Sequence, residues 1–528
     1  MTVDLKSDNN QTPNHSLQKV AKGASLVFIG SLIALFFAFI SRPIIARYWT
    51  ESDYGIFSIA YSILSICTII STLGLKQGVI QNIAYSRGKK DYKKILGLIS
   101  SSIYFSVIMS LLVGFILFLF SDLIAVEIFH EPGLIIPLRI FSLCVPFLAL
   151  IEIFSSIYRG FDQVKPTIYF QFILLNMFFS VILILIIYFN RSFENIFYAL
   201  AASIIITFIL FIFYATPRTS LKEIFKVKLI KSVISVEAKE LLFFSLPLLG
   251  AAVLNMVILW TDTLMLGGLK TTADVGLYNV AHPTAYLISF PLGSLLAIYI
   301  PVMSGLYAKR KFNEIKRNFL IITKWLCSAT LPLFIFLFLF PAPLIELIFG
   351  SNYVLAANAL RILSLGLIIN NFVGPCGASL IAMGKSKFIM FATLIAATIN
   401  IILNAILIPY HGIIGAAIAS AVSLVSINIV KGWKLYSLSR VQPMSKNLIK
   451  PTIAFLMLIV PIYLAYQNYL TLSWQLLVVL FIVSYILYFL VFLITNSLDQ
   501  EDMDLIQAIG EKTGKDVSRV KKFLSRFL

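Results

Sequence analysis

The sequence predicts an all-α polytopic membrane protein with about fourteen transmembrane helices, built as two parallel-repeat six-helix bundles plus two C-terminal helices. Three observations predict this fold class. First, 59% of the 528 residues are hydrophobic and only 12% are charged, a composition that ordinary soluble domains do not have. Second, apolar runs of at least about 18 residues recur along nearly the whole chain. Third, short motifs in the first half of the chain return in the second half.

The apolar runs give the expected helices in chain order. Each is long enough to cross a hydrocarbon layer of about 30 Å as an α-helix. The first run is followed by another span and lacks a small-residue cleavage site, so we expect a retained helix rather than a signal peptide. The expected spans are 24–46, 55–75, 95–120, 134–157, 167–189, 195–215, 241–266, 276–304, 318–340, 354–382, 388–408, 412–433, 451–467 and 472–495.

Three motifs occur twice, each pair about 221 residues apart and in the same order. Because each half holds an even number of spans, both halves start on the same side of the membrane, so the repeat is parallel. A duplicated helical bundle is typical of a secondary transporter with its site between the halves. The pairs are DYGIFSIA at 53–60 with DVGLYNVA at 274–281, EIFH at 127–130 with LIFG at 347–350, and PLRIFSL at 137–143 with ALRILSL at 359–365.

The repeat and the spans together predict six parts of the chain. Helices thirteen and fourteen have no counterpart in the repeat. The parts are a cytoplasmic N-terminal segment (1–23), a first six-helix bundle (24–215), a basic cytoplasmic connection (216–240), a second six-helix bundle (241–436), helices thirteen and fourteen (437–496) and a cytoplasmic tail (497–528).

The net charge of +18 would indicate nucleic-acid binding in a soluble protein. Here most lysines and arginines fall in every second connection, which is the positive-inside pattern of a polytopic membrane protein. The basic charge therefore sets the topology, with both termini cytoplasmic, and contacts anionic membrane lipids. We expect no nucleic-acid partner.

Motifs of catalysis and of nucleotide hydrolysis do not occur in the sequence. There is no HExxH, Walker A or GxSxG pattern, and the four histidines are scattered. The four cysteines lie inside expected spans without a CxxC spacing. The sequence therefore predicts a protein that is not an enzyme and that needs no cofactor or metal.

Ionisable residues deep inside spans are the candidates for function. Each costs about 2.5–3.5 kcal/mol to insert and usually faces a cavity or a partner. Most of those in this chain are cationic. They are Arg42, Lys76, Arg139, Glu152, Asp262, Lys324 and Arg361.

Arg42 is the strongest candidate. It ends a stripe of small and polar residues in the first span that includes Ala34 and Ala38. Such a stripe suits the wall of a wet cavity, and a planar guanidinium can bind two phosphate oxygens at once. The alternative is that Arg42 lies at the interface and snorkels to the headgroups.

The second span has a polar face that ends at Lys76. Hydroxyl groups at helical spacing could line a substrate path, or they could hold neighbouring helices together. The cation at the cytoplasmic end favours the path. The face consists of Ser58, Tyr61, Ser65, Thr68, Thr72 and Lys76.

In the second half, Asn255 and Asp262 share one face of the seventh span. Asp262 could pair with an arginine across the cavity, bind a coupling ion (H⁺ or Na⁺), or form a structural ion pair. On the eighth span, Tyr278 and His282 share a face. For His282, a hydrogen-bonded packing role is favoured over a coupling role.

The remaining intramembrane charges are expected to be structural. Arg139 and Arg361 stand in the same LRIxSL context of the repeat and are expected to anchor the chain at headgroups. Glu152 is expected to form a salt bridge within the first half. Lys324 is expected to snorkel from the inner end of the ninth span.

Several segments resemble the polysaccharide transporter, or Wzx-type oligosaccharide flippase, family. ISRPIIARYWTESDYGIFSIA at 40–60 is similar to the first-helix signature of that family, an arginine followed by a short loop ending in YG-x-F. STLGLKQGVIQNIAYSRGK at 71–89 looks like the end of its second helix, and LPLLGAAVLNMVILWTDTLMLG at 246–267 like its seventh. The resemblance implies the fold shared with lipid II flippases and multidrug extruders of the MOP superfamily. It also implies that Arg42 faces the central cavity.

The resemblance further implies a flippase of the prokaryotic cytoplasmic membrane that moves a polyprenyl-(pyro)phosphate-linked oligosaccharide by alternating access through a cationic cavity. Its partners would be the lipid-linked oligosaccharide, anionic lipids, a coupling ion and glycan-assembly enzymes. Two alternatives remain. A cation-coupled drug extruder of the same fold would need acidic cavity residues, for which Glu152 and Asp262 are the candidates. A scaffold for glycan-assembly enzymes would use the tail and the 216–240 connection.

Overall fold

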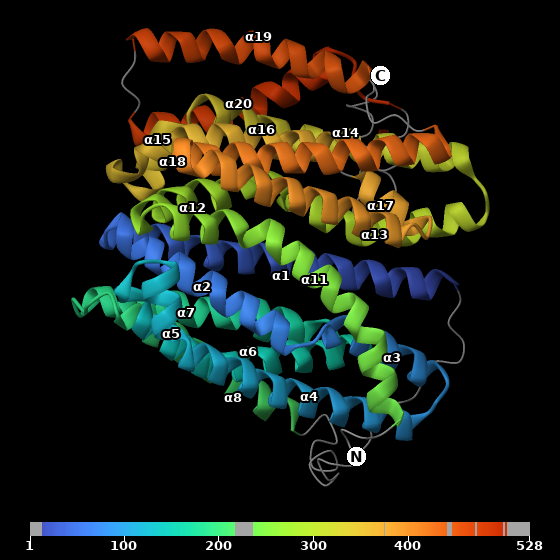
Figure 1. Cartoon of the computed structure of the whole chain (residues 1–528). Helices are drawn as coiled ribbons and strands as arrows, with labels where there is room; N and C mark the ends of the chain where they lie inside the picture. The colour runs from blue at the N-terminus through green and yellow to red at the C-terminus, as the bar shows by residue number, and fades with distance from the viewer. Residues whose placement is uncertain are drawn as a thin grey trace. The chain divides into compact units, whose positions relative to one another are not determined.

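The computed structural model describes residues 13–216, 236–373, 375–440, 446–469, 473–499 and 502–503. These residues are almost entirely helical (Figure 1), as expected where no water is present to bond the backbone. They form two compact units, Met1–Asn279 and Val280–Leu528. The predicted segment 1–23, the connection 216–240 and the tail 497–528 lie largely outside the described residues, so they stay predictions, as do the predicted domain boundaries.

The first unit contains the elements up to the start of α12. In order, they are α1 (Pro13–Tyr48), α2 (Glu51–Ser71), α3 (Leu75–Gly88), α4 (Tyr92–Leu119), α5 (Ser121–Leu123), the π-helix η1 (Ile124–Ile128), the 3₁₀-helix η2 (Pro132–Leu134), α6 (Ile135–Gly160), the π-helix η3 (Thr167–Leu174), α7 (Leu175–Tyr188), α8 (Asn195–Ala215), α11 (Val236–Leu269) and α12 (Thr272–Tyr286), whose second half belongs to the other unit.

The second unit continues from α12. In order, its elements are the 3₁₀-helix η4 (Leu287–Ser289), α13 (Phe290–Ala308), α14 (Phe312–Leu339), α15 (Pro341–Phe349), the 3₁₀-helix η5 (Ser351–Ala356), α16 (Ala357–Val373), α17 (Pro375–Ala382), α18 (Ser386–Ser439), α19 (Lys446–Tyr469) and α20 (Trp474–Ile494).

Each of the predicted apolar runs coincides with helix, which confirms the all-α fold class. Ten helical stretches of the described chain are long and apolar enough to cross a membrane. One of them, α18, joins two predicted runs at Gly412, where φ is 52° and ψ is −128°. A positive φ of this kind is accessible mainly to glycine, so the two runs are separate helices that meet at a sharp kink.

In the first unit, α6 lies among α2, α3, α4 and α8. The α4 face toward it carries small residues four apart, namely Ser102, Ser106, Ser110 and Gly114, all of them buried. Small side chains allow helix backbones to approach closely, which is how helices pack when lipid replaces water. In the second unit, α16 holds the corresponding position against α14 and α18.

The repeated motifs begin corresponding helices. DYGIFSIA begins α2 and DVGLYNVA begins α12, whereas PLRIFSL begins α6 and ALRILSL begins α16. The capping is repeated as well. Thr50 and Asp53 cap α2 through each other's backbone and side-chain groups, and Thr271 and Asp274 make the same contacts at α12. The internal repeat is therefore present in the local structure and not only in the sequence.

The first turns of α2 and α12 touch through their repeat-equivalent glycines. A Cβ on Gly55 would lie 1.8 Å from the carbonyl oxygen of Thr272, and a Cβ on Gly276 would lie 2.1 Å from that of Glu51. The Ser52 and Thr272 hydroxyls, 2.6 Å apart, close the contact. Only glycine permits this approach, which fixes the register of α2 against the part of α12 in the first unit.

The expectation that Lys324 snorkels is wrong. Its side chain is buried in the second unit, where the ammonium group donates to Asp499 at 2.7 Å and also to Asp502. The Trp325 indole donates to Asp502 at 2.9 Å. The acidic partners follow α20, far along the chain, so no pattern around Lys324 announces them. The pairing attaches the start of the predicted tail to α14.

We predict that Gly55→Ala destabilises the protein by about 1–3 kcal/mol, the usual cost of overpacking, because the new Cβ requires α2 and α12 to separate. The measurement is the melting temperature in detergent, followed by size-exclusion chromatography of heated samples. Gly250→Ala in α11 is the matched control, since its Cβ would meet nothing within 4 Å. Equal melting temperatures for the two variants would contradict the glycine contact.

Candidate functional site

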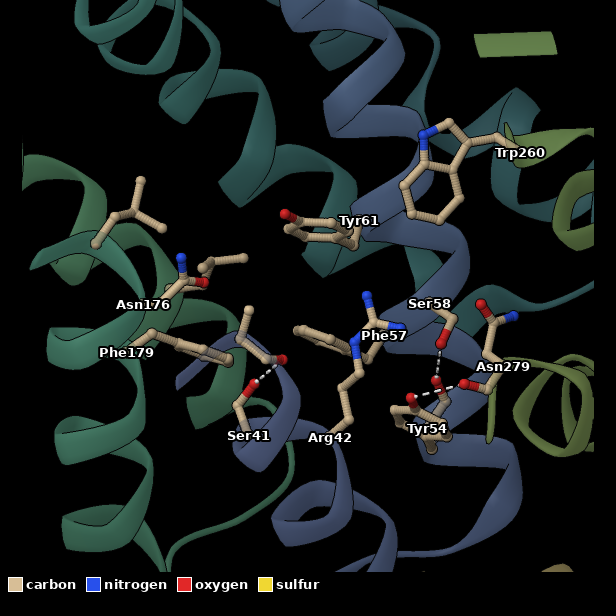
Figure 2. A pocket seen from close by; sticks show the side chains of 13 residues that line it. Ser41, Arg42, Tyr54, Phe57, Ser58, Tyr61, Asn176, Phe179, Trp260 and Asn279 are labelled. Carbon is tan, nitrogen blue, oxygen red and sulfur yellow. Dashed lines mark hydrogen bonds between the residues drawn. The ribbon is translucent and has the colours of Figure 1, made fainter. Parts of the chain in front are cut away.

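A small polar cavity of about 60 Å³ lies inside the first unit. Helices α1, α2, α7, α8, α11 and α12 contribute its walls. Figure 2 shows the side chains gathered around the guanidinium of Arg42. The lining consists of Ala38, Ser41, Arg42, Tyr54, Phe57, Ser58, Tyr61, Leu175, Asn176, Phe179, Leu200, Trp260 and Asn279.

Arg42 comes from α1 and is half-buried. Its guanidinium points into the cavity, toward Tyr61 and Ser58, with Tyr54 beside it (Figure 2). Arg42 and the Tyr54 hydroxyl are within hydrogen-bonding reach. Tyr54 in turn donates to the backbone oxygen of Asn279 at 3.1 Å. The chain of contacts runs from α1 through α2 to α12, and one hydroxyl supports the cation.

No carboxylate of the described residues forms an ion pair with Arg42, and the lining contains no acidic side chain. Arginine is always charged at physiological pH. A desolvated cation with only neutral neighbours attracts an anion, because Coulomb interactions strengthen as water is excluded. The cavity is therefore suited to a small anionic group.

The other polar side chains of the lining are bonded back into their own helices. Ser58 donates to the Tyr54 oxygen at 2.8 Å, and Asn176 donates to the Phe172 oxygen at 2.7 Å. Ser41 makes the same kind of bond to Ala38 at 3.2 Å. Side chains bonded in this way keep acceptor lone pairs available, so hydroxyl donors of a ligand can also be received.

Aromatic rings form the apolar walls. The Phe57 ring stacks on Phe179 with centroids 6.0 Å apart, and on Tyr61 at the same centroid distance. Tyr61 meets Trp260 edge to face at 6.0 Å. Aromatic side chains are the usual wall material of ligand pockets. The cavity thus joins one cation, several acceptors and a rigid aromatic frame.

The polar face of α2 is divided by the structure. Ser58 and Tyr61 line the cavity, whereas Thr68 and Thr72 are buried and bond to their own helix. The lysine at the end of the face, Lys76, lies in α3. Both earlier alternatives, path and packing, therefore describe part of this face.

Lys76 pairs with Glu152 of α6, with 3.2 Å between Nζ and Oε1. Gln171 also reaches the same oxygen, at 3.4 Å. The pair lies within the first unit, as the sequence predicts for Glu152. Neither residue is part of the cavity lining, so any contact of Lys76 with substrate stays a prediction.

The residues predicted in the second half lie apart from the cavity. Asp262 is 1% exposed and accepts a hydrogen bond from the Tyr278 hydroxyl, also 1% exposed. Asn255 is exposed and donates to the Ala251 oxygen at 2.8 Å. His282 lies in the second unit, where its ring is 4.6 Å from that of Tyr286. Their roles in transport stay predictions.

Arg139 and Arg361 each brace the helix that precedes them. Arg139 donates to both carboxylate oxygens of Asp122, at 2.9 and 3.0 Å. Arg361 donates to the Phe338 backbone oxygen at 3.1 Å and to Asn358 at 3.2 Å. The two sites perform comparable work in their own units. Headgroup anchoring stays a prediction.

Sequence reasoning did not find several residues of the lining. Tyr54 stands in the repeated motif, where it could have been noticed beside Gly55. Asn176 and Phe179 come from the fifth predicted span, which carries no charge or repeated motif. Trp260 stands two positions before Asp262 and gives no signal of its own.

A duplicated helical bundle with a polar cavity defines a membrane transporter. The chain belongs to the polysaccharide biosynthesis protein family, whose model matches residues 20–307, and the MatE family model matches residues 247–406. These are transporter families of the MOP superfamily. The protein is therefore a multi-pass membrane flippase or transporter and not an enzyme, as the sequence predicted.

Relatives with assigned roles point in the same direction. An uncharacterized membrane protein of Methanocaldococcus jannaschii is 25% identical over 84% of this chain and 89% of its own length. A probable low-salt glycan biosynthesis flippase of Haloferax volcanii is 28% identical over 32% of this chain and 36% of its own length. A putative O-antigen transporter of Shigella flexneri is 20% identical over 78% of this chain and 97% of its own length.

Solved structures show the same fold. The lipid II flippase MurJ in an inward closed conformation is similar with a TM-score of 0.70, at 16% identity, over 92% of this chain and 99% of that chain. An inward-facing multidrug resistance transporter of the MATE family is similar with a TM-score of 0.65, at 16% identity, over 78% of this chain and 96% of that chain. At this identity the likeness establishes the fold alone.

We predict that a cysteine introduced at Asn176 reacts with a small charged thiol reagent many times faster than one introduced at Ser180. Asn176 lines the cavity, whereas Ser180, one turn further along α7, is buried and bonds to the Phe37 oxygen. Both variants are made in a cysteine-free background, and labelling is followed by mass spectrometry. Similar rates at the two positions would contradict the cavity lining.

Proposed function

We propose that this protein is a flippase that moves a polyprenyl-(pyro)phosphate-linked oligosaccharide across the prokaryotic cytoplasmic membrane. The single observation that carries the proposal is a guanidinium that faces a polar cavity without an acidic partner in the described lining. A phosphate or pyrophosphate is the anionic group that a planar guanidinium binds in a bidentate manner. The relatives named as glycan flippase and O-antigen transporter support this substrate class.

The size of the cavity assigns it to the phosphate part of the substrate. A volume of about 60 Å³ is far below that of an oligosaccharide, and ligand pockets for whole small molecules have volumes of about 300–1,000 Å³. The glycan would therefore occupy space that opens during the transport cycle. Alternating access of the two repeats, typical of such transporters, would supply that space.

Arg42 would lower the cost of bringing the anion into the membrane. Charged groups at the bilayer centre are costly, and a fixed opposite charge offsets part of that cost. Tyr54 would orient the guanidinium, and Ser58 and Asn176 would accept hydrogen bonds from the sugar hydroxyls. The chemistry is binding and release only, with no covalent step.

A drug extruder is the second candidate, favoured by the MatE match at residues 247–406. Cationic drugs require acidic cavity residues. The described lining offers Arg42 instead, whereas Glu152 is paired with Lys76 and Asp262 is bonded by Tyr278. The electrostatics of the lining therefore favour an anionic substrate.

We predict that Arg42→Gln lowers the rate of glycan-lipid flipping at least about tenfold, because losing one charge-assisted contact of about 1.4 kcal/mol or more corresponds to that factor. The measurement uses proteoliposomes that contain a polyprenyl-pyrophosphate oligosaccharide and follows exposure of the glycan to an external lectin. Arg42→Lys, which keeps the charge but loses the fork, should retain part of the activity.

Arg47→Gln is the matched control, since Arg47 lies in the same helix outside the cavity lining. Wild-type rates for Arg42→Gln, with wild-type amounts of folded protein, would overturn the proposed role of the cavity. Transport of ethidium by the wild type, together with an absence of glycan flipping, would favour the drug extruder.

We also predict that the membrane potential drives the outward direction. An inside-negative potential favours outward movement of an anion by about 2.3 kcal/mol per charge per 100 mV. A potassium diffusion potential, set with valinomycin in the same proteoliposomes, should raise lectin exposure when it is negative inside and lower it when it is positive inside. Exposure that is the same at both signs would exclude net movement of negative charge during transport.

A further inference from the structure

A second cavity of about 120 Å³ lies between α2 and α11 in the first unit. Apart from Trp260 and Thr261, its walls are entirely aliphatic or thioether side chains. We call it the α2–α11 groove. Its lining consists of Ile66, Ile69, Ile70, Val253, Met256, Val257, Trp260, Thr261 and Leu264.

The α2–α11 groove and the Arg42 cavity share one wall residue, Trp260. The indole ring stands against Tyr61, which also lines the Arg42 cavity. Figure 2 shows Trp260 and Tyr61 on the same side of the Arg42 guanidinium. An anion-binding cavity and an apolar groove are therefore neighbours, separated by the width of one aromatic side chain.

The Trp260 indole nitrogen is buried and has no hydrogen-bond acceptor among the described residues. An unmet buried donor is costly, and tryptophan in folded proteins usually finds a partner. A bound ligand with acceptor oxygens would supply one here. This observation, which is independent of the shape of the groove, points to a ligand at the boundary between the two cavities.

The groove reaches the surface of the described chain. Ile70 on α2 and Val253 on α11 both line it, and their exposed fractions are 37% and 38%. A chain that enters beside Trp260 can therefore leave between these two residues. Branched aliphatic walls complement a chain that carries methyl branches, as a polyprenyl chain does.

We propose that the α2–α11 groove binds the isoprene units next to the phosphate of the polyprenyl carrier, while Arg42 binds the phosphate itself. The inference rests on the proposed function and deepens it, since it assigns the part of the lipid that enters the protein. The rest of the polyprenyl chain lies in the bilayer. A ligand in which an anionic head is joined directly to an apolar chain matches both cavities at once.

The test is photolabelling of the full chain in nanodiscs of phosphatidylethanolamine and phosphatidylglycerol. The probe is a polyprenyl pyrophosphate that carries a diazirine on the isoprene next to the pyrophosphate, and the labelled positions are mapped by mass spectrometry. Labels are expected at 66–70 and 253–264. Unlabelled polyprenyl pyrophosphate should compete with them, and added phosphatidylglycerol should not.

Val253→Trp fills the groove and should lower labelling of these segments several-fold. Leu246→Trp is the matched control, because Leu246 is exposed on the same helix and lies outside the groove lining. If Val253→Trp does not fold, Ile70→Trp blocks the groove from its opposite wall. Labels outside the two segments, or undiminished labelling in the filled variant, would overturn the inference.

Equal labelling of these segments by a phosphatidylglycerol probe, with equal competition, would also overturn the inference, because the groove would then hold ordinary membrane lipid. Arg42→Gln separates this failure from that of the proposed function. Saturable labelling that depends on Arg42 but falls outside the groove overturns only the groove. Competed groove labelling that persists unchanged in Arg42→Gln supports the groove and contradicts the proposed role of the cation.

Discussion

A guanidinium inside a membrane-spanning helix must receive partners, and the way Arg42 receives them governs the site. A carboxylate would neutralise the cation and close the cavity to anions. The chain uses the Tyr54 hydroxyl instead, and Tyr54 is fixed by its own bond to the Asn279 backbone. That bond requires α2 and α12 to lie in contact, which the reciprocal fit of Gly55 and Gly276 allows. Close packing of two glycines thus underlies the electrostatics of a cavity one turn away.

The repeat is preserved in structure but not in chemistry. Both halves keep the capped glycine motif and the arginine at the start of α6 or α16. Near the position equivalent to Arg42, however, the second half carries Asp262, which is buried against Tyr278. Duplication therefore conserves what packs the helices, whereas the charged positions differ. A cation in one repeat and a sequestered acid in the other make the described cavity positive.

Most of the fold could be predicted from the sequence, because long apolar runs have few structural solutions in lipid. The runs gave the helices, and the motifs gave the repeat. Arg42 could be selected because a cation is conspicuous among leucine and phenylalanine. Asp262 and Lys324 were equally conspicuous, but their partners, Tyr278 and the residues after α20, depend on tertiary contacts. Trp260, Asn176 and Phe179 were missed because apolar or neutral residues in a span carry no local sign of facing a cavity.

The central claim is that Arg42 binds the phosphate of the lipid-linked glycan. It is tested most directly by solid-state NMR of the protein with ¹⁵N-labelled arginine, bound to a polyprenyl-pyrophosphate oligosaccharide. The ³¹P–¹⁵N dipolar coupling is compared between the wild type and Arg42→Lys. A coupling between phosphorus and a guanidinium nitrogen that is present in the wild type and lost in the variant is the predicted result. A bound ligand with the same coupling in both proteins, or with none in the wild type, would contradict the account.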